Sequence, residues 1–401
     1  MNRVAEAEQI VSQSLPRLPA EDCPLANAHG RVLRAEVRAD RDLPPYDRVT
    51  MDGFALRSSA VAAGVRRFEV VGLQAAGMIP ISIADDAHCV EIATGAVLPA
   101  GADCVVPYED ASREGNIVTL APDLSVAAGE SVHRRASDHR AGDILLAPGM
   151  RLNARAVAVA AACGAATVRV SVLPRIAIVA TGDELAEVET PSLAAHQVRR
   201  SNDAALRAGL LAAGYHRVES LHLRDVRAEI LTALRRIVAQ FDVLLVTGGV
   251  SKGKFDFLPS VLAELGVEKR IHGVSQRPGK PFWFGMTPRH TPVFALPGNP
   301  VSAYTCFRRY VLPALRQMSG LPPAPAEYAV LAEPFAFAPD LTCFLPVRVE
   351  SMPDGVRRAF PAGTNTSGDL AGLVGTDGFL ELPAEKCEFP AGTPARFWSW
   401  A

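Results

Sequence analysis

A glycine-rich stretch at residues 241–257, with the sequence FDVLLVTGGVSKGKFDF, carries residue types that could bind an anion. Its apolar run Val243–Val246 predicts a buried strand, and the strand is followed by Gly248 and Gly249. Adjacent glycines allow a sharp turn and leave backbone amides open to a ligand. An apolar-periodic helix comes next. A strand, a glycine loop and a helix in this order are typical of anion-binding sites in open α/β sheets.

The same stretch allows two other interpretations. Gly248, Gly253 and Lys254 have the G-x-x-x-x-G-K spacing of a P-loop nucleotide hydrolase, but Phe255 stands where that motif needs a Ser or Thr to hold magnesium. A plain glycine turn with two solvated lysines would also fit these residues.

Carboxylates follow three successive strands of the predicted α/β pattern. Asp183 and Glu184 come after the first strand, Asp225 after the second, and Asp256 after the glycine loop of the third. The ends of parallel strands share one edge, so these carboxylates could converge there on Mg²⁺, which prefers oxygen ligands. An alternative interpretation is that Asp225 and Asp256 only cap helices.

Two proline-rich loops on the same predicted domain could complete such a site. The R-P-G-K-P loop (277–281) offers the cations Arg277 and Lys280, and the L-P-G-N-P loop (296–300) offers amides and the Asn299 side chain. Prolines preset the backbone, which lowers the entropy cost of holding an anion. Two tight turns without a ligand are the alternative.

The β-rich first part of the chain contributes weaker signals. Thr94-Gly95-Ala96 is a small-residue loop beside an acidic strand, and His133-Arg134-Arg135 is a basic cluster. A run of charges is more often a solvated face than a binding site.

Composition limits the function classes. The 401 residues suggest two to four domains, and the net charge of −2 does not favour a nucleic-acid partner. We expect no membrane segment, since no apolar run is long enough. The seven cysteines stand singly, with no C-x-x-C pair, so a structural zinc site is not indicated and a reduced, cytoplasmic location is expected.

The patterning predicts a multidomain α/β plus β protein. Strands alternate with helices in residues 172–320, which predicts a central, doubly wound, mainly parallel sheet. We expect a discontinuous first domain (1–40 and 140–171) interrupted by a small inserted β module (41–139). After a proline-rich linker, residues 321–401 predict a small β-barrel or sandwich.

Seven motifs together resemble one family. In order they are Met51-Asp-Gly-Phe-Ala, Ala93-Thr-Gly-Ala, Arg134-Arg135 with Asp138, Ala180-Thr-Gly-Asp-Glu-Leu, Thr247-Gly-Gly-Val-Ser, Pro278-Gly-Lys-Pro and Leu296-Pro-Gly-Asn-Pro-Val. Their order and spacing resemble the molybdopterin molybdenumtransferases (MoeA), a family that also includes the last domain of gephyrin. The resemblance covers nearly the whole chain and is weakest in the last 80 residues.

The resemblance implies a reaction in which molybdate is inserted into adenylylated molybdopterin with release of AMP and help from Mg²⁺. It implies a homodimer with active sites shared between subunits, and an upstream molybdopterin adenylyltransferase as supplier. The implied catalytic residues are Asp52, Thr94, Glu184, Asp225 and Asp256, of which Glu184 and Asp256 would hold the metal. The expected substrate-binding residues are Gly248, Gly249, Ser251, Lys252, Arg277, Lys280, Pro297, Asn299, Pro300 and Ser367.

Three departures from the family pattern and two rival functions remain. One departure is Ala136-Ser137-Asp138, where family members often have a Gly-Glu-Asp run after the arginines. Arg277 stands where the family often has Lys, and an arginine expected soon after Phe344 is replaced by Leu345-Pro346, with Arg348 two residues late. The rivals are the P-loop-like hydrolase and a scaffold that keeps this architecture without its chemistry. Binding assays with molybdopterin, AMP, ATP and molybdate would discriminate among them.

Overall fold

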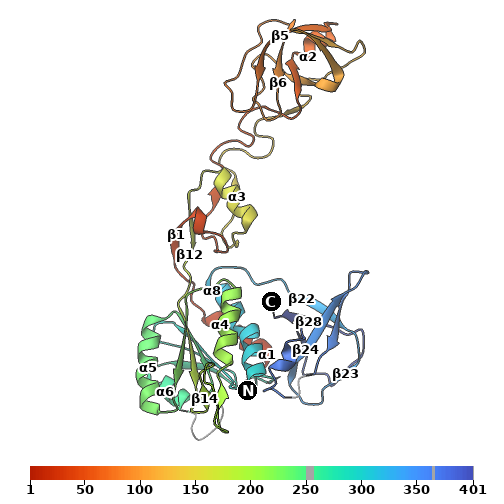
Figure 1. The fold of residues 1–401 in the computed structure, drawn as a ribbon. Helices are drawn as coiled ribbons and strands as arrows, with labels where there is room; N and C mark the ends of the chain where they lie inside the picture. The colour runs from red at the N-terminus through yellow and green to blue at the C-terminus, as the bar shows by residue number, and fades with distance from the viewer. Residues whose placement is uncertain (250–256, 364–365, 401) are drawn as a thin grey trace.

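The structure is a computed structural model that describes residues 1–249, 257–363 and 366–400. Figure 1 shows an elongated molecule with three parts along its length. A small β module lies at one end, a segment with helix α3 (Ala154–Ala162) lies in the middle, and the other end holds a large α/β sheet beside a C-terminal β structure. The other helices are α1 (Val4–Ser14), α2 (Ser58–Ala62), α4 (Asn202–Ala212), α5 (Arg227–Gln240), α6 (Leu258–Glu264), α7 (Pro300–Cys306) and α8 (Leu312–Met318).

The central sheet has six strands in the order β16-β13-β17-β21-β20-β18. The first four are parallel to one another, and β20 and β18 are antiparallel to their neighbours. Their bounds are β13 (Ile176–Thr181), β16 (Val218–Leu223), β17 (Val243–Thr247), β18 (Glu268–His272), β20 (Trp283–Met286) and β21 (Pro292–Leu296). A short parallel pair, β14 (Leu185–Ala186) and β15 (Val198–Arg199), follows the first strand.

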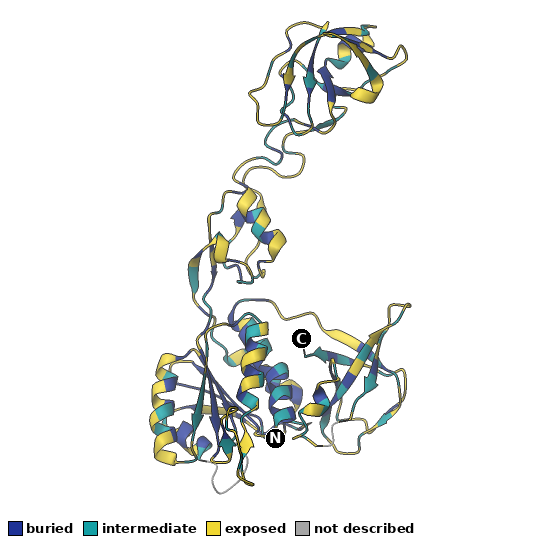
Figure 2. Cartoon of the chain, viewed as in Figure 1, coloured by how far each residue is buried: buried dark blue, intermediate teal, exposed yellow. Residues whose placement is uncertain are grey.

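Helices cover both faces of this sheet because its strands are apolar on both sides. Ile176 and Ile178 of β13 pack in the core that holds α1, α4, α7 and α8, whereas Ala177 and Val179 pack in the core that holds α5 and α6. Figure 2 shows the buried strands between helices whose outer faces are exposed. The predicted doubly wound α/β sheet is confirmed.

The chain leaves the α/β part and returns to it as a pair of antiparallel segments. Three short ladders join the outgoing and returning chains, and α3 packs beside them. They pair β1 (Ala20–Pro24) with β12 (Thr167–Ser171), β2 (Val37–Arg38) with β11 (Ile144–Leu146), and β3 (Arg48–Val49) with β10 (Val132–His133). Asn153 caps α3, since the Ala156 amide donates to Asn153 Oδ1 over 3.0 Å.

The small β module at the far end is one six-stranded sheet in the order β7-β4-β6-β5-β9-β8. Its core includes Phe54 and Phe68, which are almost fully buried. The strands are β4 (Gly53–Leu56), β5 (Arg67–Gln74), β6 (His88–Ile92), β7 (Cys104–Pro107), β8 (Ala111–Glu114) and β9 (Ile117–Leu120).

The C-terminal strands form a closed barrel, which decides between the barrel and the sandwich expected from the sequence. The order β24-β25-β22-β28-β26 closes because β26 also pairs with β24, and β19 (Gln276–Arg277) joins β24 from outside. The strands are β22 (Glu327–Leu331), β24 (Thr342–Ser351), β25 (Arg357–Pro361), β26 (Gly378–Leu382) and β28 (Pro394–Ser399), with a separate pair β23 (Phe335–Ala336) and β27 (Glu388–Phe389).

All seven cysteines are free thiols, and six of them are buried. Cys387 is the exposed one. Within the described ranges, none of the helices combines the length and the apolar character needed to cross a membrane.

Candidate functional site

Three of the predicted site loops meet at one edge of the central sheet. Strands β13, β17 and β21 are parallel neighbours, with Ala180 opposite Thr247 and Thr247 opposite Leu296. The loops that follow these strands therefore begin side by side. The Gly248 amide donates to the Leu296 carbonyl over 3.3 Å, which ties the glycine turn to the L-P-G-N-P loop.

The turn at Gly248 requires glycine. Its φ is +88°, a left-handed conformation that other residues rarely adopt. A Cβ at this position would lie 2.7 Å from the Thr181 carbonyl oxygen, so the turn packs directly against the end of β13. Gly249, which is also predicted to bind substrate, continues the turn with a φ of +66°. The predicted residues Ser251, Lys252 and Asp256 lie outside the described part of the chain.

The carboxylate loops lie at the same edge. Glu184 is exposed, and its carboxylate lies over Gly182, within 2.5–2.8 Å of where a Cβ on that glycine would be. In the loop after the neighbouring strand β16, the backbone amide of the half-buried Asp225 donates to Asp183 Oδ1 over 3.3 Å. Asp183 also accepts from Arg224 Nε over 3.4 Å, so this carboxylate links the loops after β13 and β16. Glu184 and Asp225 thus lie on adjoining loops on one side of the glycine turn, with the loop of Glu184 next to it.

The R-P-G-K-P loop has two exposed cationic side chains and a buried glycine between them. Arg277 and Lys280 are exposed, whereas Gly279 between them is buried. Gly279 has a φ of +92°, and a Cβ there would lie 2.5 Å from Cys306 Sγ. The loop is closed by the Val274 amide, which donates to the Lys280 carbonyl over 2.9 Å. A tight, glycine-dependent turn therefore holds both cations in place.

The L-P-G-N-P loop is clamped from two sides. Asn299 Nδ2 donates to Ser367 Oγ over 2.7 Å, and the Val301 amide donates to the Ser367 carbonyl over 3.1 Å. The structure thus brings two predicted substrate-binding residues, Asn299 and Ser367, into contact from the α/β part and the barrel part of the chain. Pro297 is buried, and Pro300 begins α7.

Asn202 is a residue of this clamp that the sequence reasoning missed. Its Nδ2 donates to the Gly298 carbonyl over 2.7 Å from the start of α4. An asparagine at a helix start is a signal that the sequence offers, but its partner lies 96 residues away along the chain.

Asp52 and Thr94 meet on the β module. The Thr94 amide donates to Asp52 Oδ1 over 2.6 Å, and both residues are exposed. The Thr94 backbone and side-chain hydrogen bonds lower the pKa of Asp52, so it stays a carboxylate. Nearby, Tyr108 Oη donates to Glu91 Oε1 over 3.0 Å, and desolvation together with Glu91 raises the Tyr108 pKa. Tyr108 and Glu91 were not predicted as site residues.

The basic cluster of the module is ion-paired rather than merely solvated. Arg134 pairs with Asp47 at 2.9 Å, and Arg135 pairs with Asp42 at 2.6 Å. The backbone hydrogen bond from Ala141 and the Arg135 side chain lower the pKa of Asp42. These arginines hold the outgoing and returning chains together at the base of the module.

The chain does not by itself bring all the predicted site residues that the structure describes together. Asp52 and Thr94 adjoin β4 and β6 of the β module, while Glu184 and Asp225 lie at the edge of the central sheet. Figure 1 shows the module at one end of the molecule and β14, which follows Glu184, at the other. The two halves of the predicted site are therefore separated within one chain.

A cavity of about 670 Å³ lies elsewhere, between α1, α8, the linker after it and the barrel. None of the predicted site residues that the structure describes lines it. Arg151 and Arg316 on its wall donate to backbone carbonyls, of Gly30 and Pro322 respectively. These contacts support the packing of the parts rather than a ligand.

Known proteins resemble this chain along its whole length. Residues 2–164 match the model of the MoeA N-terminal region (domain I and II), residues 177–317 that of the probable molybdopterin binding domain, and residues 328–400 that of the MoeA C-terminal region (domain IV).

Individual relatives agree with these matches. The chain is 41% identical to the molybdopterin molybdenumtransferase of Synechocystis over 402 residues, covering 100% of both chains. It is 34% identical to that of Synechococcus elongatus, covering 94% of each. A crystal structure of the molybdopterin biosynthesis MoeA protein from Pyrococcus horikoshii superposes with a TM-score of 0.83 at 26% identity, over 100% of this chain and 99% of that one. On these grounds the chain belongs to the molybdopterin molybdenumtransferase (MoeA) family.

Proposed function

We propose that this enzyme inserts molybdate into adenylylated molybdopterin and releases AMP, giving molybdenum cofactor. The observation that carries the proposal is the meeting of the glycine turn at Gly248, the carboxylate loop of Glu184 and the L-P-G-N-P loop at one sheet edge. Both substrates are anions, and this edge offers the donors and the carboxylates that such a reaction needs.

Anion binding would rest on amides and fixed cations. The amides of Gly248 and Gly249 follow a strand end, where successive N–H groups can hold an oxyanion. Arg277 and Lys280 supply charge-assisted hydrogen bonds, which are shorter and stronger than neutral ones. Arg277 offers a planar, two-pronged donor where a lysine would offer a point charge. Ser251 and Lys252 remain predicted members of this set.

Mg²⁺ fits the donor chemistry of the edge. In the described part of the chain no cluster of three or more His, Cys, Asp or Glu side chains is present, as a preformed protein-only metal site would require. Mg²⁺ needs fewer protein ligands, since it is usually bound by one or two carboxylates together with phosphates and water. Glu184 and Asp256 would hold it. When bound, the ion neutralises charge that develops on the phosphate.

The separation of the two half-sites supports a shared active site. Asp52 and Thr94 of one subunit would complete the edge carrying Glu184 and Asp225 of another, in a twofold homodimer. This arrangement accounts for the exposed carboxylates of Asp52 and Glu184, which lie toward opposite ends of the elongated molecule. An upstream molybdopterin adenylyltransferase would supply the substrate, in the cytoplasm. The division into domains at residues 41, 140, 172 and 321 stays a prediction.

The test is turnover by the purified protein with adenylylated molybdopterin, molybdate and Mg²⁺. We expect release of AMP together with molybdenum bound in the pterin product. Hydrolysis of ATP without any effect of molybdate would favour a nucleotide hydrolase instead. Binding of molybdopterin without turnover would favour a scaffold that has lost its chemistry.

A further inference from the structure

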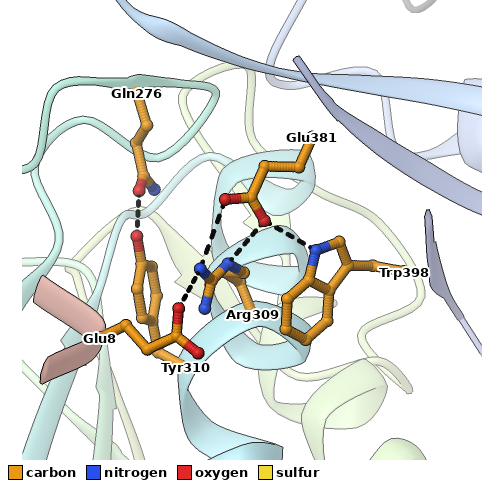
Figure 3. Close-up of polar contacts among 6 residues, drawn as sticks. All are labelled: Glu8, Gln276, Arg309, Tyr310, Glu381 and Trp398. Carbon is orange, nitrogen blue, oxygen red and sulfur yellow. Dashed lines mark hydrogen bonds and ion pairs between the residues drawn. The ribbon is translucent and has the colours of Figure 1, made fainter. Parts of the chain in front are cut away.

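The R-P-G-K-P loop rests on a buried polar pair below it, Gln276 and Tyr310. Gln276 is fully buried and directly precedes Arg277, and Tyr310 is 2% exposed. Tyr310 Oη donates to Gln276 Oε1. Figure 3 shows this hydrogen bond beside Arg309 and the residues around it, Glu8, Glu381 and Trp398. Tyr310 also stacks on Phe282, with ring centroids 4.4 Å apart, so its ring is held from one side by packing.

The amide end of Gln276 reaches into the loop itself. Its Nε2 donates to the Gly279 carbonyl over 3.2 Å and to Cys306 Sγ over 3.4 Å. Burial raises the pKa of Tyr310 well above its ordinary value, so the hydroxyl stays protonated and acts as the donor to Gln276. This fixes the amide orientation, with the oxygen toward Tyr310 and the nitrogen toward Gly279.

Tyr310 is itself fixed by its neighbour in sequence. Arg309 lies in the π-helical turn Phe307–Val311, is 2% exposed, and pairs with Glu381 at 3.0 Å and with Glu8 at 2.6 Å. The guanidinium also lies 4.5 Å from the ring of Trp398. The barrel and α1 therefore hold the helix turn that carries Tyr310 (Figure 3).

We propose that Gln276 and Tyr310 are positioning residues that fix the R-P-G-K-P loop in the conformation that presents Arg277 and Lys280 to the anionic substrate. The proposal rests on the proposed function, because it needs that loop to bind an anion. The proposal also assigns a role to the C-terminal barrel, because its residues Glu381 and Trp398 hold Arg309, the neighbour of Tyr310 in sequence. Neither positioning residue is exposed, so neither contacts substrate.

Tyr310→Phe tests the proposal because it removes one hydroxyl and keeps the stacked ring. We expect the Kd for molybdate, measured by calorimetry, to rise about three- to ten-fold, as for the loss of one hydrogen bond. In AMP release, KM for the pterin substrate should rise more than kcat falls. Tyr304→Phe, on the same helical segment but stacked on Phe307 and near Trp400, is the matched control and should bind like wild type.

A double-mutant cycle separates positioning from a general structural effect. If Tyr310 acts through the loop, Tyr310→Phe should weaken molybdate binding in the wild-type background and weaken it less when Lys280→Ala is present, because the loop then has only Arg277 left to present. Equal effects in both backgrounds would overturn the proposal, as would wild-type affinity in Tyr310→Phe.

Gln276→Glu keeps an acceptor for Tyr310 but turns a carboxylate toward the Gly279 carbonyl. If Tyr310→Phe fails to fold, Gln276→Glu takes its place and is expected to show the same loss of molybdate affinity. Wild-type affinity in Gln276→Glu would then overturn the proposal.

Amide hydrogen exchange measures how firmly the R-P-G-K-P loop is held, and it needs no ligand. The amides of Val274 and Phe282 donate to Lys280 and Gly279 within the loop, and both should exchange faster in Tyr310→Phe. Unchanged exchange would contradict the positioning role. If wild type neither binds molybdate nor releases AMP, the proposed function fails, while faster exchange in the variant would still show that Tyr310 holds the loop.

Discussion

Thr94 and Asp52 are joined by a backbone hydrogen bond of 2.6 Å between two turns of the β module, 42 residues apart in sequence. The bond links the loop that follows β6 to the turn that precedes β4. Because its acceptor is a carboxylate, its strength depends on the charge of Asp52, and so the geometry of this half-site depends on pH.

We predict that Asp52 keeps its charge to a lower pH than an ordinary Asp. The Thr94 amide stabilises the carboxylate, so the folded pKa of Asp52 lies below the unfolded value of about 3.9. The contribution of the bond is then fully present above the unfolded pKa and lost as pH falls through the lower folded value. The Thr94 amide shift, followed by NMR, should titrate with a midpoint below that of an ordinary Asp. The transition should vanish in Asp52→Asn, and a midpoint at or above 3.9 would contradict the prediction.

The metal prediction concerns Glu184→Gln and Asp256→Asn. Each should lower turnover far more than substrate affinity, because both carboxylates are proposed to hold Mg²⁺ at the substrate phosphate. AMP release is measured against magnesium concentration, with Glu189→Gln, an exposed carboxylate beyond β14, as the control. Unchanged rates and an unchanged magnesium midpoint in both variants would remove these residues from the metal site.

Anion capture is tested by Lys280→Ala. Loss of the exposed ammonium should weaken binding of molybdate or of the pterin substrate by about 1–3 kcal/mol, the scale of a hydrogen bond to a charged group. Lys280→Arg should recover only part of the affinity, because its guanidinium has a different shape. Titration calorimetry measures both, and Lys269→Ala, an exposed lysine of β18, serves as the control. Wild-type affinity in Lys280→Ala would make Lys280 a solvated turn residue.

Stability should depend strongly on Arg309. Burial opposes its charge, but Glu381, Tyr310 and Glu8 outweigh that effect and raise its pKa. Arg309→Met would leave Glu381 beside an apolar side chain, and removing one partner of a buried pair costs about 3–5 kcal/mol. Thermal and urea unfolding should show this loss. Arg270→Met, which breaks an exposed pair with Glu268, should change stability by less than about 1 kcal/mol. Similar small losses in both would contradict the prediction.

Shared active sites predict complementation between two inactive variants. Asp52→Asn and Asp256→Asn subunits are mixed under conditions that allow exchange, which mass spectrometry of tagged subunits verifies. In a mixed dimer one site carries both defects and the other carries none. About a quarter of all sites should then be active at equal, random mixing, as twofold symmetry requires. If mixed dimers form without activity, each site is built within one subunit.

The elements around the site could be predicted because their signals are local. The run Val243–Val246 and the glycines after it define a buried strand and its turn, and the structure places β17 there. The proline loops were recognisable for the same reason, since Pro and Gly restrict the backbone at the residue itself.

Contacts between distant segments could not be predicted. Arg309 follows Arg308 on a helix, a pattern that usually indicates a solvated face, yet it is buried by carboxylates 301 and 72 residues away. Asn202 likewise gains its partner only when α4 packs on the sheet and brings Asn202 to Gly298 in the loop after β21. Such pairs depend on the tertiary fold, which no local pattern encodes.

The buried cysteines bear on the metal chemistry of the enzyme. Burial raises the pKa of Cys89, Cys104 and Cys343 to about 12, and it raises that of Cys306 as well. The thiolate, not the thiol, is the form that binds metals, so these four side chains are poor ligands at neutral pH. The proposed product holds molybdenum through a pair of pterin sulfurs. These four cysteine sulfurs are protonated and enclosed. They would therefore not compete with the pterin sulfurs for molybdenum when molybdate is converted into the sulfur-bound metal.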